Sequence, residues 1–479
     1  MKKASVLEHL ASVLIIFLVF FVPFSASVLA SDLPVTDVSA EKEWTFLVFV
    51  NGDNNLDEHG VDDHQEMASA GSNEFLNIVT LFDRFKAPAT INFIEKNNVK
   101  VIREMGEVDM GDYRVLVQFV RDMVQQYPAK HYALVIWNHG SGWKFQEDMP
   151  RGISYDDSSG NHITTNQLQT AVMEVKQQLG RKLDILAMDA CLMQMMEVVY
   201  AVADSVDYVV ASEEVEPMEG YPYDRILARF AGKTTPANFC QLIVRHYGNF
   251  YSTYEPPDDD FIVRENKAKR IYDTSQSALD CSFVPRIKSG LDKICSHLIK
   301  GNHVASFKEA LMKAQHFSSS GNIDLIDFLS FLKECSSDEE LKKLITETLE
   351  VLDRAVIANS ATAADGYSEN PEFRANGIAV FLPGYSWLLK DVYFDLSWSK
   401  ESLWDEMLLD YLKKIESQNI SSALENGNIE PFKEFLKKNS QNRAEITSHV
   451  ISKVNFLTFC ETKLSDSLKQ EISELINQN

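Results

Sequence analysis

The residues best suited to chemistry are concentrated in two short stretches. His139 lies in Asn-His-Gly-Ser-Gly-Trp at 138–143, and Cys191 lies in Met-Asp-Ala-Cys-Leu-Met at 188–193. A thiolate can attack a carbonyl carbon, and an imidazole can then protonate the departing amine. Taken singly, a buried structural cysteine and a hydrogen-bonded loop histidine would also explain these residues. If the fold brings the two together, they form a Cys-His pair suited to acyl transfer.

The neighbours of this pair suggest how the charges of such a reaction would be stabilised. Gly140 has no side chain, so its backbone N–H can approach a substrate oxygen closely. Together with the N–H of Cys191 it would form an oxyanion hole. A helix is predicted over 192–203, and its first unpaired N–H groups would favour the thiolate form of Cys191.

Strand-like apolar runs lead directly into both stretches. The run 132–137 precedes His139, and the run 185–188 precedes Cys191. Between residues 44 and 212, short β-rich runs alternate with longer helical ones, which predicts an α/β fold with a mostly parallel sheet and helices on both faces. Ligands of open α/β sheets bind beyond the carboxyl ends of the strands. We therefore expect His139 and Cys191 to lie at one edge of the sheet.

The other elements of this region follow from the spacing of apolar residues and from helix-end signals. Asp112 is a candidate N-cap, Thr164 with Gln167 forms a candidate capping box, and Gly180 is a stop signal. Further strands are predicted over 45–50, 78–82 and 208–211, with a hairpin across 91–102, and helices over 56–70, 113–126, 165–179 and 192–203.

The N-terminus has the order of a secretory signal. Lys2 and Lys3 precede an apolar stretch, and Val-Leu-Ala stands before Ser31. We expect residues 1–30 to be a signal peptide and the mature protein to be exported, whether secreted, periplasmic or held at the cell surface. If the segment is not removed, it would instead anchor the protein, because residues 10–29 nearly span a bilayer.

Three regions are predicted after the signal peptide: a catalytic core over 31–235, a largely helical subdomain over 236–412, and a helical tail over 413–479. In the second region the apolar period is helical over 239–251, 279–298 and 339–352. A β-like run near 377–382 would either rejoin the sheet or belong to this subdomain.

Composition limits the class of protein. A chain of 479 residues with 45% hydrophobic residues is globular and long enough for more than one domain. The net charge of −24, without a compact basic patch, excludes a nucleic-acid partner. Six cysteines are too few for a disulfide scaffold in a chain of this length.

Read together, the two stretches resemble the histidine and cysteine motifs of the clostripain family of cysteine peptidases, which are caspase-like enzymes. Tyr221 stands where the family commonly has tryptophan, a difference that affects pocket shape more than chemistry. The resemblance covers roughly residues 44 to 408. Other blocks that look familial are Asn-Gly-Asp-Asn-Asn-Leu at 51–56, Ala-Ser-Glu-Glu at 211–214, Gly-Tyr-Pro-Tyr at 220–223, and the segments 324–328 and 377–383.

The resemblance implies a caspase-like fold in which His139 and Cys191 form a catalytic dyad without an obligatory third acid. It also implies protein or peptide substrates cleaved after arginine or lysine, with Asp189 near the floor of the S1 pocket. A carboxylate there could pair with a guanidinium or ammonium group. The alternative for Asp189 is a structural carboxylate that holds loop N–H groups. The alternative for the whole chain is a catalytically silent exported protein that binds peptides on the same fold.

Self-cleavage is a further expectation, since the stretch 143–160 joins the histidine loop to the next helix and contains Lys144 and Arg151. A loop tethered beside a Lys/Arg-specific site is present at high effective concentration. Relatives of this kind are often activated by a cut in this region. We expect cleavage after Arg151 or, failing that, after Lys144.

No cofactor is required by this chemistry, but calcium is a candidate because some relatives depend on it. Two acidic groups are rich enough in oxygen ligands, although neither has EF-hand spacing. They are Asp53 with Asp57, Asp62 and Asp63, and the run Asp258, Asp259 and Asp260.

Overall fold

The computed structural model describes residues 39–143, 152–228, 230, 233–254, 273–319, 321–363, 373–384, 388, 389 and 391–425, together with the single positions 428, 430, 431, 433 and 470. The predicted signal peptide, Lys144, Arg151, the run 258–260 and most of the predicted tail therefore lie outside the described residues.

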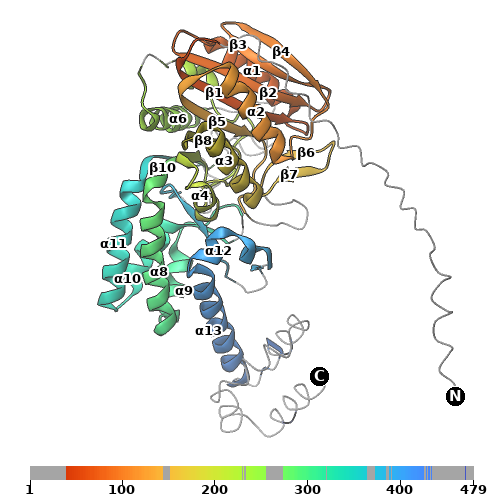
Figure 1. The fold of residues 1–479 in the computed structure, drawn as a ribbon. Coiled ribbons are helices and arrows are strands. Elements are labelled where there is room, and N and C mark those ends of the chain that lie inside the picture. Colours follow the sequence, from red (N-terminus) through yellow and green to blue (C-terminus); the bar gives the residue numbers. More distant parts are fainter. Residues whose placement is uncertain are drawn as a thin grey trace, which may run out of the picture. The chain divides into compact units, whose positions relative to one another are not determined.

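A nine-stranded sheet lies at the centre of the fold, with the strand order β12-β10-β9-β8-β5-β1-β2-β3-β4 (Figure 1). Strands β9, β8, β5, β1 and β2 pair in parallel, whereas β3 and β10 run antiparallel to their neighbours. The predicted mostly parallel sheet is confirmed. The strands are β1 Lys42–Gly52, β2 Leu76–Arg84, β3 Ala87–Glu95, β4 Asn98–Gly106, β5 Ala129–Trp137, β8 Leu183–Asp189, β9 Val206–Ala211, β10 Thr274–Asp280 and β12 Val356–Thr362.

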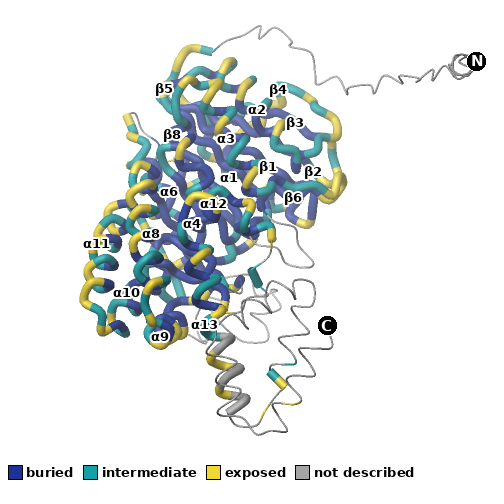
Figure 2. Tube along the Cα trace, turned by 60° about the horizontal axis from the view of Figure 1, so that its bottom comes forward, coloured by how far each residue is buried: buried dark blue, intermediate teal, exposed yellow. Residues whose placement is uncertain are grey.

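Helices cover both faces of this sheet, as predicted. Alternate residues of β1 point to opposite faces, so Phe46 and Val48 belong to one buried cluster and Leu47 and Phe49 to another. The first cluster packs under α1 Asp57–Ala70, α5 Tyr223–Ala228 and α6 Pro236–Tyr251, and the second under α2 Tyr113–Gln126, α3 Thr165–Leu179 and α4 Met196–Val202. Figure 2 shows buried strands between helices whose outer sides are exposed.

The predicted ends of α2 and α3 are confirmed where a capping side chain or a glycine terminates the helix. The Asp112 carboxylate accepts a hydrogen bond from the N–H of Arg114 at the start of α2. Thr164 and Gln167 form the reciprocal capping box of α3, which ends at Gly180 in the left-handed conformation with φ 67°.

Two predicted helix starts are wrong. The helix predicted from residue 192 begins at Met196, because Leu192 has φ 63°, which no right-handed helix allows. The helix predicted from residue 279 begins at Val284, since Leu279 belongs to β10 and pairs with Val209.

The sheet crosses the boundary predicted between residues 235 and 236, because β10 pairs with β9 and β12 pairs with β10. The helices that follow group together beyond this edge (Figure 1), and α13 crosses the boundary predicted between residues 412 and 413. The helices after β10 are α8 Val284–Lys300, α9 Val304–Lys313, α10 Leu325–Cys335, α11 Glu339–Ala355, α12 Ser397–Glu401 and α13 Trp404–Glu425.

The β-like run near 377–382 does not rejoin the central sheet. Its strand β13, Ala379–Phe381, pairs instead with β11, Asn322–Asp324. The N–H of Ala379 also donates to the carbonyl of Gln194 at 2.9 Å, so β13 contacts the segment that follows Cys191.

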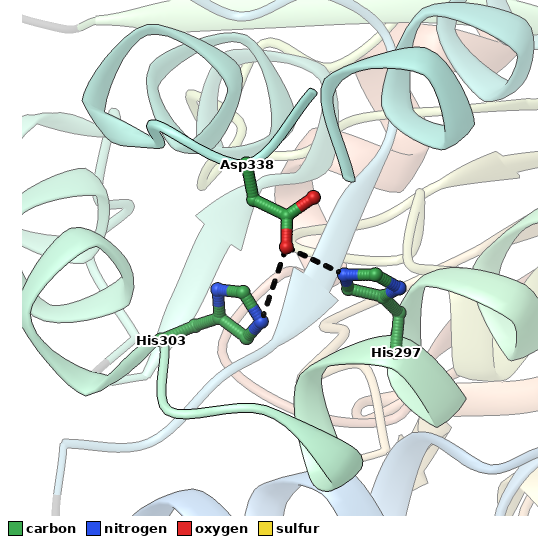
Figure 3. A group of neighbouring side chains, drawn as sticks. All are labelled: His297, His303 and Asp338. Carbon is green, nitrogen blue, oxygen red and sulfur yellow. Dashed lines mark hydrogen bonds and ion pairs between the residues drawn. The ribbon is translucent and has the colours of Figure 1, made fainter. Parts of the chain in front are cut away.

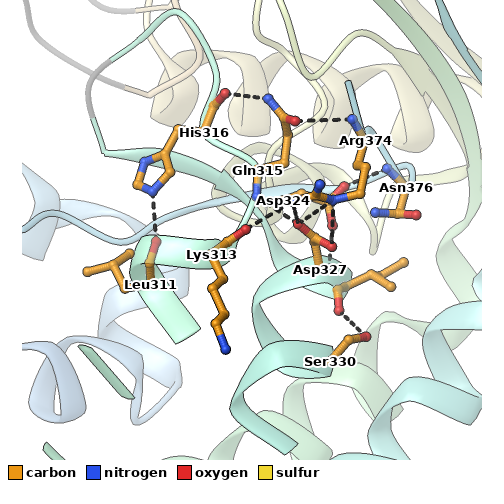
Figure 4. Close-up of polar contacts among 10 residues, drawn as sticks. Leu311, Lys313, Gln315, His316, Asp324, Asp327, Ser330, Arg374 and Asn376 are labelled. Atoms are coloured by element: carbon orange, nitrogen blue, oxygen red, sulfur yellow. Dashed lines mark hydrogen bonds and ion pairs between the residues drawn. The ribbon is translucent and has the colours of Figure 1, made fainter. Parts of the chain in front are cut away.

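Polar contacts fix the chain before β13. The Arg374 guanidinium pairs with Asp327 of α10 at 3.2 Å, and the Asn376 N–H donates to Asp324 (Figure 4). Together they hold the approach to β13 against the start of α10.

Among the helices, Asp338 caps α11 and its Oδ2 atom faces two imidazoles, at 2.9 Å from His297 and 3.9 Å from His303 (Figure 3). This contact links the ends of α8, α9 and α11.

Within the described part of the chain, Cys191, Cys240, Cys281, Cys295 and Cys335 are free thiols. Over the same residues, no helix combines the length and the apolar character needed to cross a bilayer.

Candidate active site

The two predicted stretches lie side by side at the carboxyl edge of the sheet. Trp137 of β5 is in register with Asp189 of β8, and the N–H of Asn138 donates to the Asp189 carbonyl at 3.2 Å. A Cβ atom added to Gly140 would lie 2.4 Å from the carbonyl oxygen of Cys191. Only glycine therefore allows the histidine loop to approach the cysteine backbone this closely.

Asparagine side chains hold the strand ends that carry His139. Asn138 Nδ2 donates to the Asn51 carbonyl at 2.6 Å, which ties the end of β5 to β1. Asn138 Oδ1 accepts from the N–H of Tyr155 at 2.6 Å, in strand β6, Ile153–Asp156, which forms a small hairpin with β7, Asn161–Ile163. The histidine loop is thus fixed from two sides.

The imidazole of His139 is half-buried, and its Nε2 atom lies 2.7 Å from Oδ1 of Asn55. Because an amide oxygen only accepts, Nε2 carries the proton in this contact and Nδ1 is the basic nitrogen. Burial lowers the pKa of His139, against the opposing charge of Asp157. Asn55 was not predicted as a site residue, although it belongs to the block 51–56 that resembles the family.

Burial disfavours the thiolate form of Cys191. It raises the pKa of the thiol to about 12, although the Glu216 N–H donates to Sγ at 3.2 Å and opposes that shift. The predicted help from a helix start at residue 192 is wrong, because α4 begins only at Met196. Among the described residues, no hydrogen bond joins His139 to Cys191, and Sγ of Cys191 contacts the backbone of Glu216 instead.

Asp189 is buried and accepts hydrogen bonds from the N–H of Tyr221 at 3.2 Å and the hydroxyl of Tyr223 at 2.8 Å. Burial raises its pKa to about 6, and burial with the charge of Asp189 raises the pKa of the adjacent Glu216 carboxyl further. These bonds fit the structural alternative for Asp189, and the concentration of acidic groups fits the binding of a cation.

Further acidic side chains surround this pair. Asp63, which accepts from Trp137 Nε1 at 2.6 Å, and Glu66 both belong to α1, and burial together with the charge of Asp189 raises the pKa of each. One oxygen of Glu216 is buried without a hydrogen-bond partner among the described residues. Glu216 and Asp63 are site residues that sequence reasoning missed as partners of Asp189, because they lie far from it along the chain.

Lys144 and Arg151 lie outside the described residues, but both flanks of their segment are described. The N–H of Ser141 donates to the Gly152 carbonyl at 3.0 Å, and Gly140 forms a β-bridge with Ile153. The described residues on both sides of the segment 144–151 therefore lie together, next to His139 in the chain.

The acidic group predicted around Asp53 does not form a single site. Asp57 pairs with Arg84 at 2.7 Å, and Asp63 faces Trp137. Asp53 instead lies with Asp83 and Asp156. A second group of side chains of the kinds that bind metals consists of His297, His303 and Asp338. In this group Asp338 already contacts His297 at 2.9 Å (Figure 3).

The sequence profile of the clostripain family matches residues 48–417, well over half of the chain. The protein belongs to the clostripain family. It is 23% identical to clostripain of Hathewaya histolytica over 399 residues, which cover 71% of this chain and 74% of that protein. The enzyme class follows from the family: the chain is a cysteine peptidase that acts on peptides or proteins.

Solved structures of clostripain-family (C11) proteases share the fold. The secreted protease iotapain of Bacteroides thetaiotaomicron is 18% identical with a TM-score of 0.60, over 76% of this chain and 99% of that one. An inactive zymogen from Parabacteroides distasonis is 19% identical with a TM-score of 0.58, over the same shares. These likenesses show the caspase-like fold.

Proposed function

We propose that this clostripain-family protein is an endopeptidase that cleaves after arginine or lysine through Cys191 and His139. The observation that carries the proposal is the contact between the two loops, where Gly140 packs against the backbone of Cys191 at adjacent strand ends.

In this mechanism His139 is the general base of a neutral pair. Its Nδ1 atom takes the thiol proton as Sγ attacks the scissile carbonyl carbon, and the N–H groups of Gly140 and Cys191 face the developing oxyanion. The imidazolium then protonates the departing amine, which leaves an acyl-enzyme thioester. Water activated by His139 hydrolyses the thioester and restores the thiol.

The buried acidic group supports the preference for basic residues. A guanidinium or ammonium group that reached Asp189 and Glu216 would find two carboxyl groups and one unpartnered oxygen. Bidentate pairing of arginine with a carboxylate also fixes the substrate in register with Sγ. The neutral Glu216 would lose its proton as the cation binds.

Self-processing and export complete the proposal. The segment that contains Lys144 and Arg151 starts and ends beside His139, which favours cleavage after Arg151, or after Lys144, by the protein's own site. Residues 1–30 would be removed on export, and contact with a membrane would persist only if they are retained.

The test is hydrolysis of fluorogenic peptides that differ only at P1, by the wild type, Cys191→Ala and His139→Ala. We expect cleavage only after Arg and Lys, and turnover lowered by several orders of magnitude in both variants with unchanged circular dichroism. N-terminal sequencing of wild type and Cys191→Ala reports both the signal cut and the loop cut. Absence of any basic-P1 cleavage by the intact protein would favour the silent peptide-binding alternative.

A further inference from the structure

Two imidazoles and a carboxylate converge among the helices, outside the catalytic site (Figure 3). His297 lies in the last turn of α8, His303 directly precedes α9 and Asp338 directly precedes α11. One ligand atom from each lies within 4.8 Å of the others, and Oδ2 of Asp338 lies 2.9 and 3.9 Å from the two Nε2 atoms. The side chains expose 27%, 14% and 33% of their surface in chain order, so an ion can reach them from solvent.

Contacts within the protein satisfy only part of this group. The 3.9 Å between His303 and Asp338 is too long for a hydrogen bond. Among the described residues, neither ring nitrogen of His303 takes part in a hydrogen bond. The ring is nevertheless held in place, because only glycine at position 301 leaves room for it: a Cβ atom on Gly301 would overlap with Nε2 of His303. The imidazole therefore faces Asp338 with a nitrogen that is available to a ligand.

The charges of the group favour a bound cation. Backbone N–H groups at the start of α11 and the imidazole of His297 lower the pKa of Asp338 to about 2, so this carboxyl group is ionised. Burial lowers the pKa of His303 against the charge of Asp338, which favours the neutral imidazole that binds metals. The positive charge of Lys414 also acts on His303, but Lys414 pairs with Asp410 at 2.6 Å.

We propose that His297, His303 and Asp338 bind Zn²⁺. Imidazole nitrogens with a carboxylate oxygen suit Zn²⁺, whereas Mg²⁺ and Ca²⁺ prefer oxygen ligands alone. Zn²⁺ holds such ligands at about 2.0–2.2 Å, so two ligands of one ion lie at most about 4.4 Å apart. From the observed limit of 4.8 Å, the half-exposed side chains reach this spacing by moving less than about 1 Å. Water would take the fourth position.

Such an ion would tie together the ends of three helices. Its ligands come from the end of α8 and from the residues that begin α9 and α11, which packing and one hydrogen bond, between His297 and Asp338, otherwise hold together here. We therefore assign the ion a structural role, in which it stabilises the helical region beyond the sheet. This role does not depend on the proposed peptidase activity.

The test uses the full chain without a polyhistidine tag, carrying Cys191→Ala so that the catalytic thiol cannot bind the metal. After EDTA treatment and removal of the chelator, titration calorimetry with ZnCl₂ should report one bound equivalent, and the thermal midpoint should rise by several degrees. Co²⁺ should give the visible absorption spectrum of tetrahedral nitrogen and oxygen coordination. An excess of CaCl₂ should leave Zn²⁺ bound, because Ca²⁺ prefers oxygen ligands.

Matched variants in the same background locate the site. His303→Gln and Asp338→Asn should each weaken Zn²⁺ binding at least about tenfold and abolish the thermal shift. Asp338→Asn keeps an oxygen that can cap α11, so its loss of binding reports the ligand rather than a folding defect. The controls are His59→Gln, a half-buried histidine of α1, and Asp112→Asn, the N-cap of α2, and both should bind Zn²⁺ like the parent.

Three results would overturn the site. They are the absence of binding at about 100 μM ZnCl₂, unchanged affinity in both His303→Gln and Asp338→Asn, and an equal loss in His59→Gln, which would indicate non-specific binding to histidines.

Discussion

Burial favours the neutral forms of His139 and Cys191, because it lowers the pKa of the imidazole and raises that of the thiol. In the proposed mechanism His139 would therefore act as a base during the attack, and the rate would depend on its orientation. Asn55 would supply that orientation through the hydrogen bond to Nε2. It acts as a positioning residue, because it touches His139 and the proposal gives it no contact with substrate.

Two variants of Asn55 test this role. Asn55→Ala should lower kcat by about 10- to 100-fold with little change in KM, since only proton transfer is impaired. Asn55→Asp keeps the acceptor and adds a charge that stabilises imidazolium, so the acid limb of the kcat profile should move to higher pH. The measurement is the pH–rate profile of both variants. An unmoved acid limb in Asn55→Asp would remove Asn55 from the mechanism.

The preference for basic residues is predicted to depend on the charge of Asp189. Asp189→Asn should lower kcat/KM for Arg and Lys at P1 by at least about 100-fold, because a buried cation would lose its partner. The matched control is Asp324→Asn: Asp324 is also buried beside a second carboxyl, Glu213, with its pKa raised to about 6 by burial. Peptide series that vary only at P1 give the comparison. Equal losses in both variants would point to a general folding defect.

The same carboxylate predicts that KM for basic substrates depends on pH. Since burial raises the pKa of Asp189 to about 6, its charge is lost as pH falls through 6, and KM for these substrates should rise there. In Asp189→Asn this rise should be absent.

At the scale of elements, the loop after β5 can meet the loop after β8 only because Gly140 lacks a side chain. Gly140→Ala would place Cβ 2.4 Å from the Cys191 carbonyl, so one loop must move. We expect a stability loss of about 1–3 kcal/mol and a fall in kcat of at least about 100-fold. Gly384→Ala is the control, since a Cβ there meets nothing within 4 Å. Full activity in Gly140→Ala would exclude this N–H from the oxyanion hole.

Elements with a clear apolar period were predictable from the sequence, and α2 and α3 match to the residue. Strands β10 and β12 were missed because half or more of each is polar or alanine and neither shows a long apolar run or a clear alternation. The start of α4 was missed because the left-handed turn at Leu192 is set by tertiary contacts, including its N–H to the Glu214 carbonyl. Local spacing could not reveal a conformation imposed from another loop.

The site was predictable to the same extent. Strand ends brought His139 and Cys191 to one edge, since parallel strands share that edge. Asn55 and Glu216 join them from distant segments, and their contacts depend on side-chain direction, which a single sequence does not contain.

For the molecule as a whole, buried acids should make stability depend on pH. Burial raises the pKa of Glu197 to about 7 and that of Glu66 to about 7, above the value of about 4.3 expected unfolded. The folded state therefore holds protons that the unfolded state releases, so this stabilisation is complete below about pH 4.3 and is lost as pH rises through 7.

Thermal midpoints should accordingly rise as pH is lowered from about 8.5 to 5.5, measured by scanning fluorimetry at constant ionic strength on Cys191→Ala. Glu197→Gln removes one of these groups and should flatten the dependence. A midpoint that falls over this range would show that these acids are ionised in the folded protein.

The raised pKa values of Asp189 and Glu216 have a thermodynamic consequence for substrate recognition. A cationic side chain that binds beside these carboxyl groups would favour their ionised forms, so binding of each basic peptide would release protons into the solvent. The observed heat of binding would then change with the ionisation enthalpy of the buffer. The affinity for basic peptides would rise with pH although the contacts stay the same. The pH of the surroundings would thus influence which peptides the enzyme binds.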